Sequence, residues 1–357
     1  MLRLERRAEV SRAMAAATPV IAVALTVFAG FALFALLGRD PVNGLYQFFI
    51  SPISTSYGLA ELAVKATPLI LIALGLGIGF RAGVWNIGAE GQLTLGAIAG
   101  GGVALLFWNV DGLWVLPLMT VAGILGGMAW GAIPAFLKAR FDVNEILVSL
   151  MLTYVATLLL SLLVHGPWKD PDGYGFPESR LFTDSALLPV ILAGTRLHVG
   201  AALTLLAALA IWLLVARTLI GFQVRVIGQA PAAARFAGFS RPAMIWFCFL
   251  LSGGLAGLAG LYEVAGPVQQ LVPTISPGYG FTAIIVAFLG RLHPIGIVLA
   301  GLLVALSYLG GENAQIAAGL PQAVTGVFQG LLLFFLLGTD VLVHYRLRYG
   351  TPASRKA

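Results

Sequence analysis

The chain of 357 residues is 59% hydrophobic and only 10% charged, with a formal net charge of +6. A soluble domain has about a quarter charged residues, so too few polar side chains are present to cover a water-facing surface, and a soluble globular protein is excluded. The apolar residues form continuous runs without alternation, which excludes a transmembrane β-barrel and predicts membrane-spanning helices of about 20 residues.

The first apolar run, 18–37, follows a basic segment that contains Arg3, Arg6, Arg7 and Arg12. This run is too long for a signal-peptide core and is followed by a poor cleavage site, so we expect a retained first helix. The sequence therefore predicts an all-α polytopic membrane protein with about ten transmembrane helices. The predicted spans are 18–37, 59–79, 92–108, 113–136, 145–164, 198–216, 243–264, 281–290, 295–310 and 322–339.

The basic residues predict the orientation of these spans. Of the 21 Lys and Arg residues, only Arg39, Lys169, Arg180 and Arg196 fall in connections opposite the N-terminus, and Lys65 falls inside a span. Because Lys and Arg concentrate in cytoplasmic connections, both termini are expected in the cytoplasm, and the positive charge indicates membrane orientation and no nucleic-acid partner. The predicted parts are a cytoplasmic basic segment (1–17), a transmembrane domain (18–340) with a periplasmic loop at 165–197 and a cytoplasmic loop at 217–242, and a cytoplasmic basic tail (341–357).

Catalytic and nucleotide-binding motifs are absent from the sequence. None of the lysines is followed by Ser or Thr, so the P-loop pattern GxxxxGK[ST] is missing, and HExxH, CxxC and GxSxG are missing as well. The four histidines are far apart in sequence, and the one cysteine, Cys248, lies in an apolar run. We therefore expect a chain that is no enzyme, with no catalytic residue, no metal site and no cofactor of its own.

A polar, glycine-rich segment, FRAGVWNIGAEGQLTLGA (80–97), interrupts two apolar runs. Its glycines allow a helix to unwind or to pack closely against another helix. Unwound backbone at membrane depth is tolerated only where protein or a water-filled cavity surrounds it. The segment is either a turn with a small-residue packing face or a broken helix whose Asn86, Glu90 and Gln92 line a substrate path. In the second case Glu90 needs a partner, and Arg81 is the nearest in sequence.

A second interrupted segment, QQLVPTISPGYG (269–280), precedes the span 281–290. Two Gly/Pro-interrupted segments in separate halves of a chain indicate the central pathway of a transporter, so Gln269 and Gln270 join the candidate path. Acidic residues at span ends have alternatives: Glu61 and Lys65, four apart on one helix face, are expected to neutralise one another or to snorkel, and Glu263 is similarly ambiguous.

The run GVWNIGAEGQLTLGA (83–97) resembles the signature of permease subunits of ABC importers in the branched-chain amino acid and simple-sugar class. Its Asn-Ile-Gly-x-Glu-Gly-Gln core is similar to the nucleoside-type permeases served by basic-membrane-protein-like binding lipoproteins. Further matches cover 227–240, 252–266 and 276–296, and the resemblance extends over about 65–345.

The resemblance implies a transmembrane permease domain in the bacterial inner membrane. Its implied partners are a second permease subunit, in a heterodimer, two separate ABC ATPase domains that bind the ATP, and an extracytoplasmic substrate-binding lipoprotein. The loop 217–242 is the candidate for docking on the ATPase. Ala233, Ala234 and Gly238 match the coupling pattern Glu-Ala-Ala-x-x-x-Gly, whereas Ala232 replaces its glutamate. The residues expected to carry the coupling are Gly228, Ala233, Ala234, Arg235 and Gly238.

The implied function is ATP-driven import of a neutral, polar solute, with a nucleoside as the first expectation. Trp85 would stack on the base, and the side-chain amides of Asn86, Gln92, Gln269 and Gln270 would bond to base or sugar. A simple-sugar importer of the same architecture is one alternative. A secondary transporter driven by protons through Glu61, Glu90 or Glu263 is another, and a membrane enzyme is a third.

Overall fold

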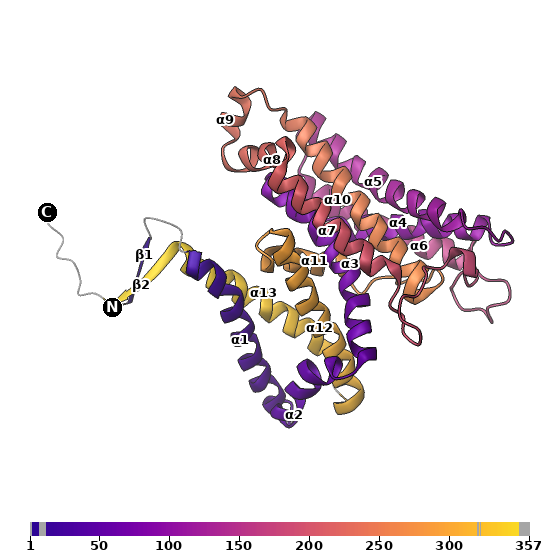
Figure 1. Cartoon of the computed structure of the whole chain (residues 1–357), viewed down its shortest axis with the longest axis horizontal. Coiled ribbons are helices and arrows are strands. Elements are labelled where there is room, and N and C mark those ends of the chain that lie inside the picture. The colour runs from indigo at the N-terminus through magenta and orange to yellow at the C-terminus, as the bar shows by residue number, and fades with distance from the viewer. Residues whose placement is uncertain (1, 7–11, 320, 322, 350–357) are drawn as a thin grey trace. The chain divides into compact units, whose positions relative to one another are not determined.

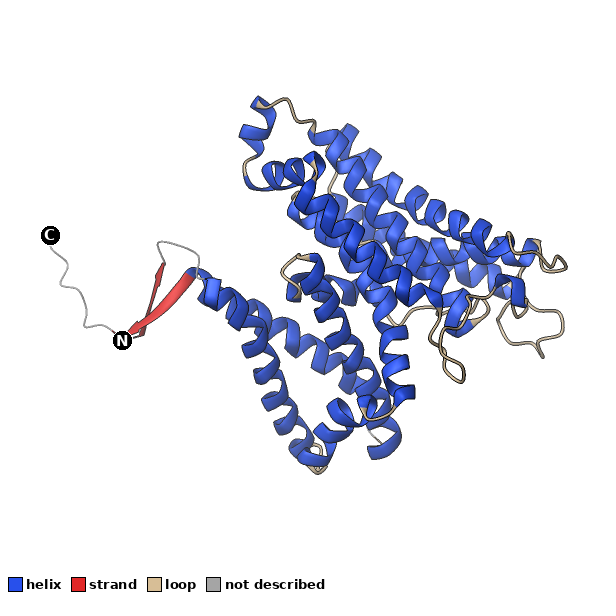
Figure 2. Ribbon diagram, viewed as in Figure 1, coloured by secondary structure: helices blue, strands red, loops and turns tan. Residues whose placement is uncertain are grey.

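The computed structural model describes residues 2–6, 12–319, 321 and 323–349. Within these ranges the chain consists mainly of helices joined by loops, with two short strands (Figure 1, Figure 2). The helices are α1 (Arg12–Leu36), α2 (Pro41–Leu45), α3 (Ser56–Arg81), α4 (Ala89–Leu106), α5 (Val115–Phe141), α6 (Glu145–His165), α7 (Val199–Arg217), α8 (Leu219–Gln229), α9 (Pro231–Phe236), α10 (Arg241–Glu263), α11 (Tyr279–Leu289), α12 (Pro294–Ala318) and α13 (Ala323–His344). The strands are β1 (Leu2–Arg6) and β2 (Tyr345–Tyr349), and short 3₁₀ or π turns occur at Tyr46–Ile50, Ser51–Ile53, Asp184–Ala186 and Val264–Val268.

The prediction of an all-α polytopic membrane protein is confirmed, since each of the ten predicted spans coincides with one helix. Eight segments of the described chain are long and apolar enough to cross a membrane: Ala17–Leu36, Ser56–Arg81, Val115–Phe141, Glu145–His165, Val199–Arg217, Arg241–Val268, Pro294–Ala317 and Gly326–Val343. The other two predicted spans are α4, which begins with polar residues, and α11. With 11 residues, α11 measures about 16 Å. That is half the thickness of a bilayer core, so α11 cannot cross it alone.

The chain divides into two compact units, which are described separately: residues 1–55 together with 306–357, and residues 56–305. In the first unit α1 packs along α13, and the rings of Phe34, Phe48 and Phe328 form its buried core. Strands β1 and β2 pair antiparallel with Leu2 opposite Tyr349, so residues 2–6 and 345–349 lie side by side.

The second unit is a helical bundle built around α4, α5 and α10. Where these helices cross, glycine faces glycine: a side chain at Gly96 would overlap the backbone of Gly257, and one at Gly127 would overlap Gly253. Small residues allow helix backbones to approach closely in a membrane, where apolar side chains gain nothing from leaving lipid. Of the two roles that the sequence allowed for the glycines of 80–97, Gly96 therefore has that of close helix packing.

Candidate functional site

The polar segment 82–88 folds back into the bundle after α3 ends at Arg81. The amide of Val84 donates a hydrogen bond to the carbonyl of Gly79 at 2.9 Å, so the chain runs back along the last turns of α3. Two residues further on, Asn86 contacts Ser252, which lies at the middle of α10. Helix α4 therefore begins at about the middle of α10 and not at its end.

The side-chain amides of Asn86 and Gln92 bond to each other in a buried pair. Asn86 Nδ2 donates to Gln92 Oε1 at 2.8 Å, and Gln92 Nε2 donates to Asn86 Oδ1 at 3.2 Å. Asn86 also donates to Ser252 Oγ at 2.8 Å and accepts from the amide of Gly88 at 3.0 Å. Both amides are almost inaccessible to solvent, with 3% and 1% exposure. In this conformation they bind the segment to α10.

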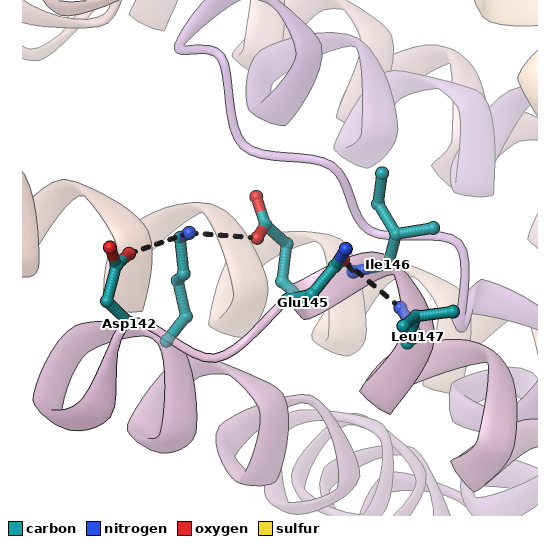
Figure 3. A network of polar contacts seen from close by, with 6 residues as sticks. Asp142, Glu145, Ile146 and Leu147 are labelled. Atoms are coloured by element: carbon teal, nitrogen blue, oxygen red, sulfur yellow. Dashed lines mark hydrogen bonds and ion pairs between the residues drawn. The ribbon is translucent and has the colours of Figure 1, made fainter.

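Helix α6 holds the same segment from the other side. The amide of Ile87 donates to Ser149 Oγ at 3.2 Å, one turn into α6. The start of α6 is fixed by the Asn144 side chain, which accepts from the second and third amides after it. Lys138 of α5 bridges Asp142 and Glu145 at 2.8 and 3.2 Å across the same corner (Figure 3). A fixed corner here gives Ser149 a fixed place against the segment.

Glu90 lies in the first turn of α4, and its carboxylate faces the first turn of α11. Glu90 Oε2 accepts a hydrogen bond from the amide of Gly280 at 2.6 Å, with further bonds from Ser276 and Gly278. A helix N-terminus presents unpaired amides and positive partial charge, and both stabilise a carboxylate. The expected partner, Arg81, is wrong: both residues are described, and no ion pair joins them. We call the contact between the starts of α4 and α11 the half-helix junction, comprising residues 86–92, Ser252 and residues 276–280.

The two helices that meet at the junction run in opposite directions. Helix α11 ends near the end of α3, where the ring of Phe288 stacks on that of Phe80 at 5.2 Å. The extended chain before α11 comes from the other side, because Leu271 packs against Gly101 of α4 and exchanges hydrogen bonds with Ser179. The sequence pairing of segments 80–97 and 269–280 therefore has a physical basis: their helices meet at their N-termini.

The structure separates the remaining candidate path residues from the junction. Trp85 is 39% exposed and contacts Phe80 and Phe288 at ring distances of 4.9 and 6.1 Å. Gln269 lies at the far end of the extended chain with an exposed side chain, and Gln270 donates to Glu178 at 3.0 Å. The junction thus brings together Asn86, Glu90 and Gln92, whereas Trp85 lies toward the end of α3 and the two glutamines lie against the loop 165–197.

The candidate coupling residues lie on α8, on α9 and just after α9. Gly228 packs so closely on the carbonyl of Arg81 that a Cβ would overlap it, which joins α8 to the end of α3. In α9, Ala233 and Arg235 are exposed and Ala234 is buried. Gly238, with φ of +77°, provides the left-handed residue that follows the helix.

Sequence reasoning missed Phe236, the most prominent residue of this surface. Its side chain is 94% exposed at the end of α9, beside the exposed Arg235. The available signal was a large aromatic side chain within the stretch AAARFAG (232–238), whose other residues are alanine and glycine apart from Arg235. Aromatic and arginine side chains are enriched at protein–protein interfaces, so Phe236 and Arg235 are candidates for contact with a partner.

Glu61 pairs with a residue that the sequence could not indicate. Arg196, from the loop before α7, donates to both carboxylate oxygens of Glu61, with a distance of 3.0 Å from Nε to Oε1. This bond raises the pKa of the Arg196 guanidinium above its ordinary value. The expectation that Glu61 is neutralised by Lys65 is therefore corrected. The charges of Lys65 and Arg196 also act electrostatically on Glu263. Among the described residues, no group of three His, Cys, Asp or Glu side chains is placed to hold a metal ion.

Comparisons with known proteins agree with this architecture. Residues 58–337 match the protein family described as branched-chain amino acid transport system / permease component. The chain is 39% identical over 356 residues to the glucose ABC transporter permease protein TsgB13 of Haloferax volcanii, covering 97% of this chain and 93% of that protein. It is 32% identical to the guanosine ABC transporter permease protein NupP of Bacillus subtilis, covering 89% and 92%. It is 26% identical to the nucleoside ABC transporter permease protein NupB of Lactococcus lactis, covering 89% of each.

Proposed function

The chain belongs to the branched-chain amino acid transport system permease family, and from this we propose that it is the membrane-spanning subunit of an ATP-driven importer of nucleosides. As a multi-pass permease it is a transport component. The observation that supports this proposal most directly is the half-helix junction. Transporters bind substrate near the middle of the membrane, where helices are interrupted and their ends supply polar backbone groups.

The substrate class rests on the chemistry of the pathway and on the relatives. Asn86, Gln92 and Glu90 bond within the protein in this conformation and would offer hydrogen-bonding groups to a solute once the junction opens. Trp85 offers an exposed indole face beside Phe288. A nucleoside has both features that such a path would recognise, a hydroxyl-rich ring and a flat base that stacks on aromatic side chains. The guanosine and nucleoside permeases among the relatives favour the same class.

A monosaccharide is the second candidate substrate. The 39% identity to a glucose permease over nearly the whole chain favours it specifically. A monosaccharide would use the same hydroxyl-binding groups but would leave the aromatic face of Trp85 without a base. The two candidates therefore differ in their dependence on Trp85.

The energy for transport would come from two ABC ATPase domains on separate chains, since this sequence has no P-loop. We place their docking site on α9, with Arg235 and Phe236 exposed to a cleft on the ATPase. Movement of α8 and α9 would be transmitted to the junction through direct contacts. Gly228 of α8 packs on Arg81, the last residue of α3, and the chain continues from Arg81 to Asn86 and Glu90. The other proposed partners are a second permease subunit, in a heterodimer in the bacterial inner membrane, and an extracytoplasmic binding lipoprotein.

Uptake in cells that contain all partner subunits tests the substrate. We expect radiolabelled guanosine or adenosine to accumulate in an ATP-dependent manner, and accumulation to be lost when this chain is deleted. Trp85→Ala is expected to lower nucleoside uptake at least about tenfold, the order of one lost stacking contact. Uptake of glucose with no uptake of nucleosides would identify the second candidate. Transport on a proton gradient without ATP would overturn the proposal.

A further inference from the structure

A cavity of about 800 Å³ lies between α4 and the loop 165–197, at the end of α4 away from the half-helix junction. One wall is the outer half of α4, from Ile98 to Leu106, and the other is formed by Pro167, Trp168 and Lys169 with Arg180. Its volume is in the range of sites that bind organic ligands. The proposed transport path does not use this cavity.

The floor of the cavity is apolar and is shaped by small residues. Ala99, Gly102 and Val103 lie on one face of α4 and line the hollow. The indole of Trp168 lies directly over Gly102, where a Cβ would be 2.9 Å from the ring. A groove with a Gly and Ala floor under an aromatic side chain fits an extended hydrocarbon chain, which needs no polar partner.

The rim of the cavity is cationic. Arg180 lies 4.9 Å from the ring centre of Trp108 and 3.7 Å from Asp170, at the limit of an ion pair. Lys169 forms no ion pair with any residue that the structure describes. One cation is thus weakly neutralised and the other is not neutralised, while Trp108 and Trp168 lie beside them at the end of a membrane helix. Tryptophan at this position is typical of the level of lipid headgroups.

We infer that this cavity binds an anionic phospholipid, with the phosphate between Lys169 and Arg180 and an acyl chain along Ala99, Gly102 and Val103. Cations at the rim and hydrocarbon below match a molecule that is charged at one end and apolar at the other. A free anion would leave the floor empty. A sugar would find an apolar floor with no carboxylate or amide among the cavity's lining residues to bond its hydroxyls.

The bound lipid would also reach the half-helix junction through the loop. Glu178 and Ser179, close to Arg180, bond to Gln270 and Leu271 at 3.0 and 2.9 Å. The chain from Leu271 continues to Gly280 and its contact with Glu90. A lipid that orders residues 167–180 would therefore also order residues 271–280, which form one side of the junction. This effect does not depend on which solute is transported.

Native mass spectrometry of the purified full chain with added lipid tests this inference. We expect one phosphatidylglycerol to be retained more strongly than phosphatidylcholine, and Lys169→Gln/Arg180→Gln to weaken its binding about tenfold or more, since each cation near a headgroup contributes substantially. Arg140→Gln/Arg217→Gln removes equal charge from exposed positions elsewhere and is expected to leave this binding unchanged.

A variant that keeps both cations guards against misfolding of the charge variant. Gly102→Val places side-chain atoms where Trp168 lies, so we expect it also to weaken phosphatidylglycerol binding. Three results would each overturn the inference. The first is retention of phosphatidylcholine equal to that of phosphatidylglycerol, and the second is a site that glycerol phosphate or inorganic phosphate alone can saturate. The third is unchanged phosphatidylglycerol binding in both Lys169→Gln/Arg180→Gln and Gly102→Val.

Discussion

The carboxylate of Glu90 and the amide of Gly280, 190 positions apart in sequence, lie 2.6 Å apart where two oppositely directed helices begin. Each helix covers part of the depth of the bundle, and an extended segment completes each crossing. The contact therefore closes the bundle at its middle. We expect the proposed importer to rearrange this contact when it alternates between two open forms. Substrate that binds both forms equally cannot shift their equilibrium, so the energy for the change would come from the ATPase subunits.

Glu90→Gln is expected to lower ATP-dependent uptake strongly while leaving the amount of protein in the membrane nearly unchanged. The substitution keeps the size of the side chain but removes the charge that the α11 N-terminus stabilises, an interaction of about 1–2 kcal/mol. Uptake measured alongside quantitative immunoblotting checks this. Asp184→Asn, a charge removal at an exposed loop position, serves as the control. Full uptake by Glu90→Gln would show that the charge has no role.

Gly280→Ala is expected to destabilise the chain by several kcal/mol or to prevent its insertion. The added Cβ would overlap the backbone of Glu90, and backbone on both sides leaves little room to move. Gly330→Ala is the matched control, because nothing lies within 4 Å of a Cβ at Gly330. Thermal unfolding of both variants in detergent measures the difference. Equal melting temperatures would mean that α4 and α11 do not approach as described.

Arg196→Gln is expected to be more destabilising than the double variant Glu61→Gln/Arg196→Gln. The single change leaves the carboxylate of Glu61 buried, with a side-chain exposure of 5%, and without its guanidinium partner. The Arg196 side chain is 51% exposed, but the carboxylate is buried, so losing the guanidinium leaves an uncompensated buried charge, whereas removing both charges leaves two neutral groups. Thermal unfolding of the two single variants and the double variant gives the coupling energy between Glu61 and Arg196. If the two single losses of stability add up to the loss in the double variant, the ion pair contributes nothing to stability.

The stability of the chain is expected to fall as the pH is lowered from about 6.5 to about 4, in part because of His198. This residue precedes α7, and burial lowers its pKa from 6.5 to about 4. Its Nδ1 accepts from the amide of Gly200 at 3.2 Å, which only the neutral ring can do. Between these pH values the unfolded chain binds the extra proton, so stability decreases as the pH falls through this window.

The variant His198→Asn tests this pH dependence, since asparagine caps the helix without titrating. Melting temperatures of both proteins from pH 7.5 to 4.5 are compared. As the pH falls, the melting temperature of the original protein is expected to fall more than that of His198→Asn. Parallel curves would assign the pH dependence to other groups.

The membrane fold could be predicted from the sequence because apolar run length is a local property. All ten runs became helices, and the two Gly-rich and Pro-rich interruptions identified the segments that meet at the junction. Their contacts could not be predicted, because each joins residues distant in sequence: Asn86 with Ser252, and Glu61 with Arg196. For Glu90 and for Glu61 a sequence neighbour, Arg81 and Lys65 respectively, was a plausible partner, but in the fold Glu90 bonds to Gly280 and Glu61 to Arg196.

The central claim is that this chain forms a path driven by separate ATPase subunits through α9. Uptake of labelled guanosine into proteoliposomes that contain the whole complex, compared with the chain alone, tests it most directly. We predict accumulation only with the ATPase subunits and ATP, and its loss when Arg235 and Phe236 are both changed to alanine. Accumulation by this chain alone on a proton gradient would contradict the account.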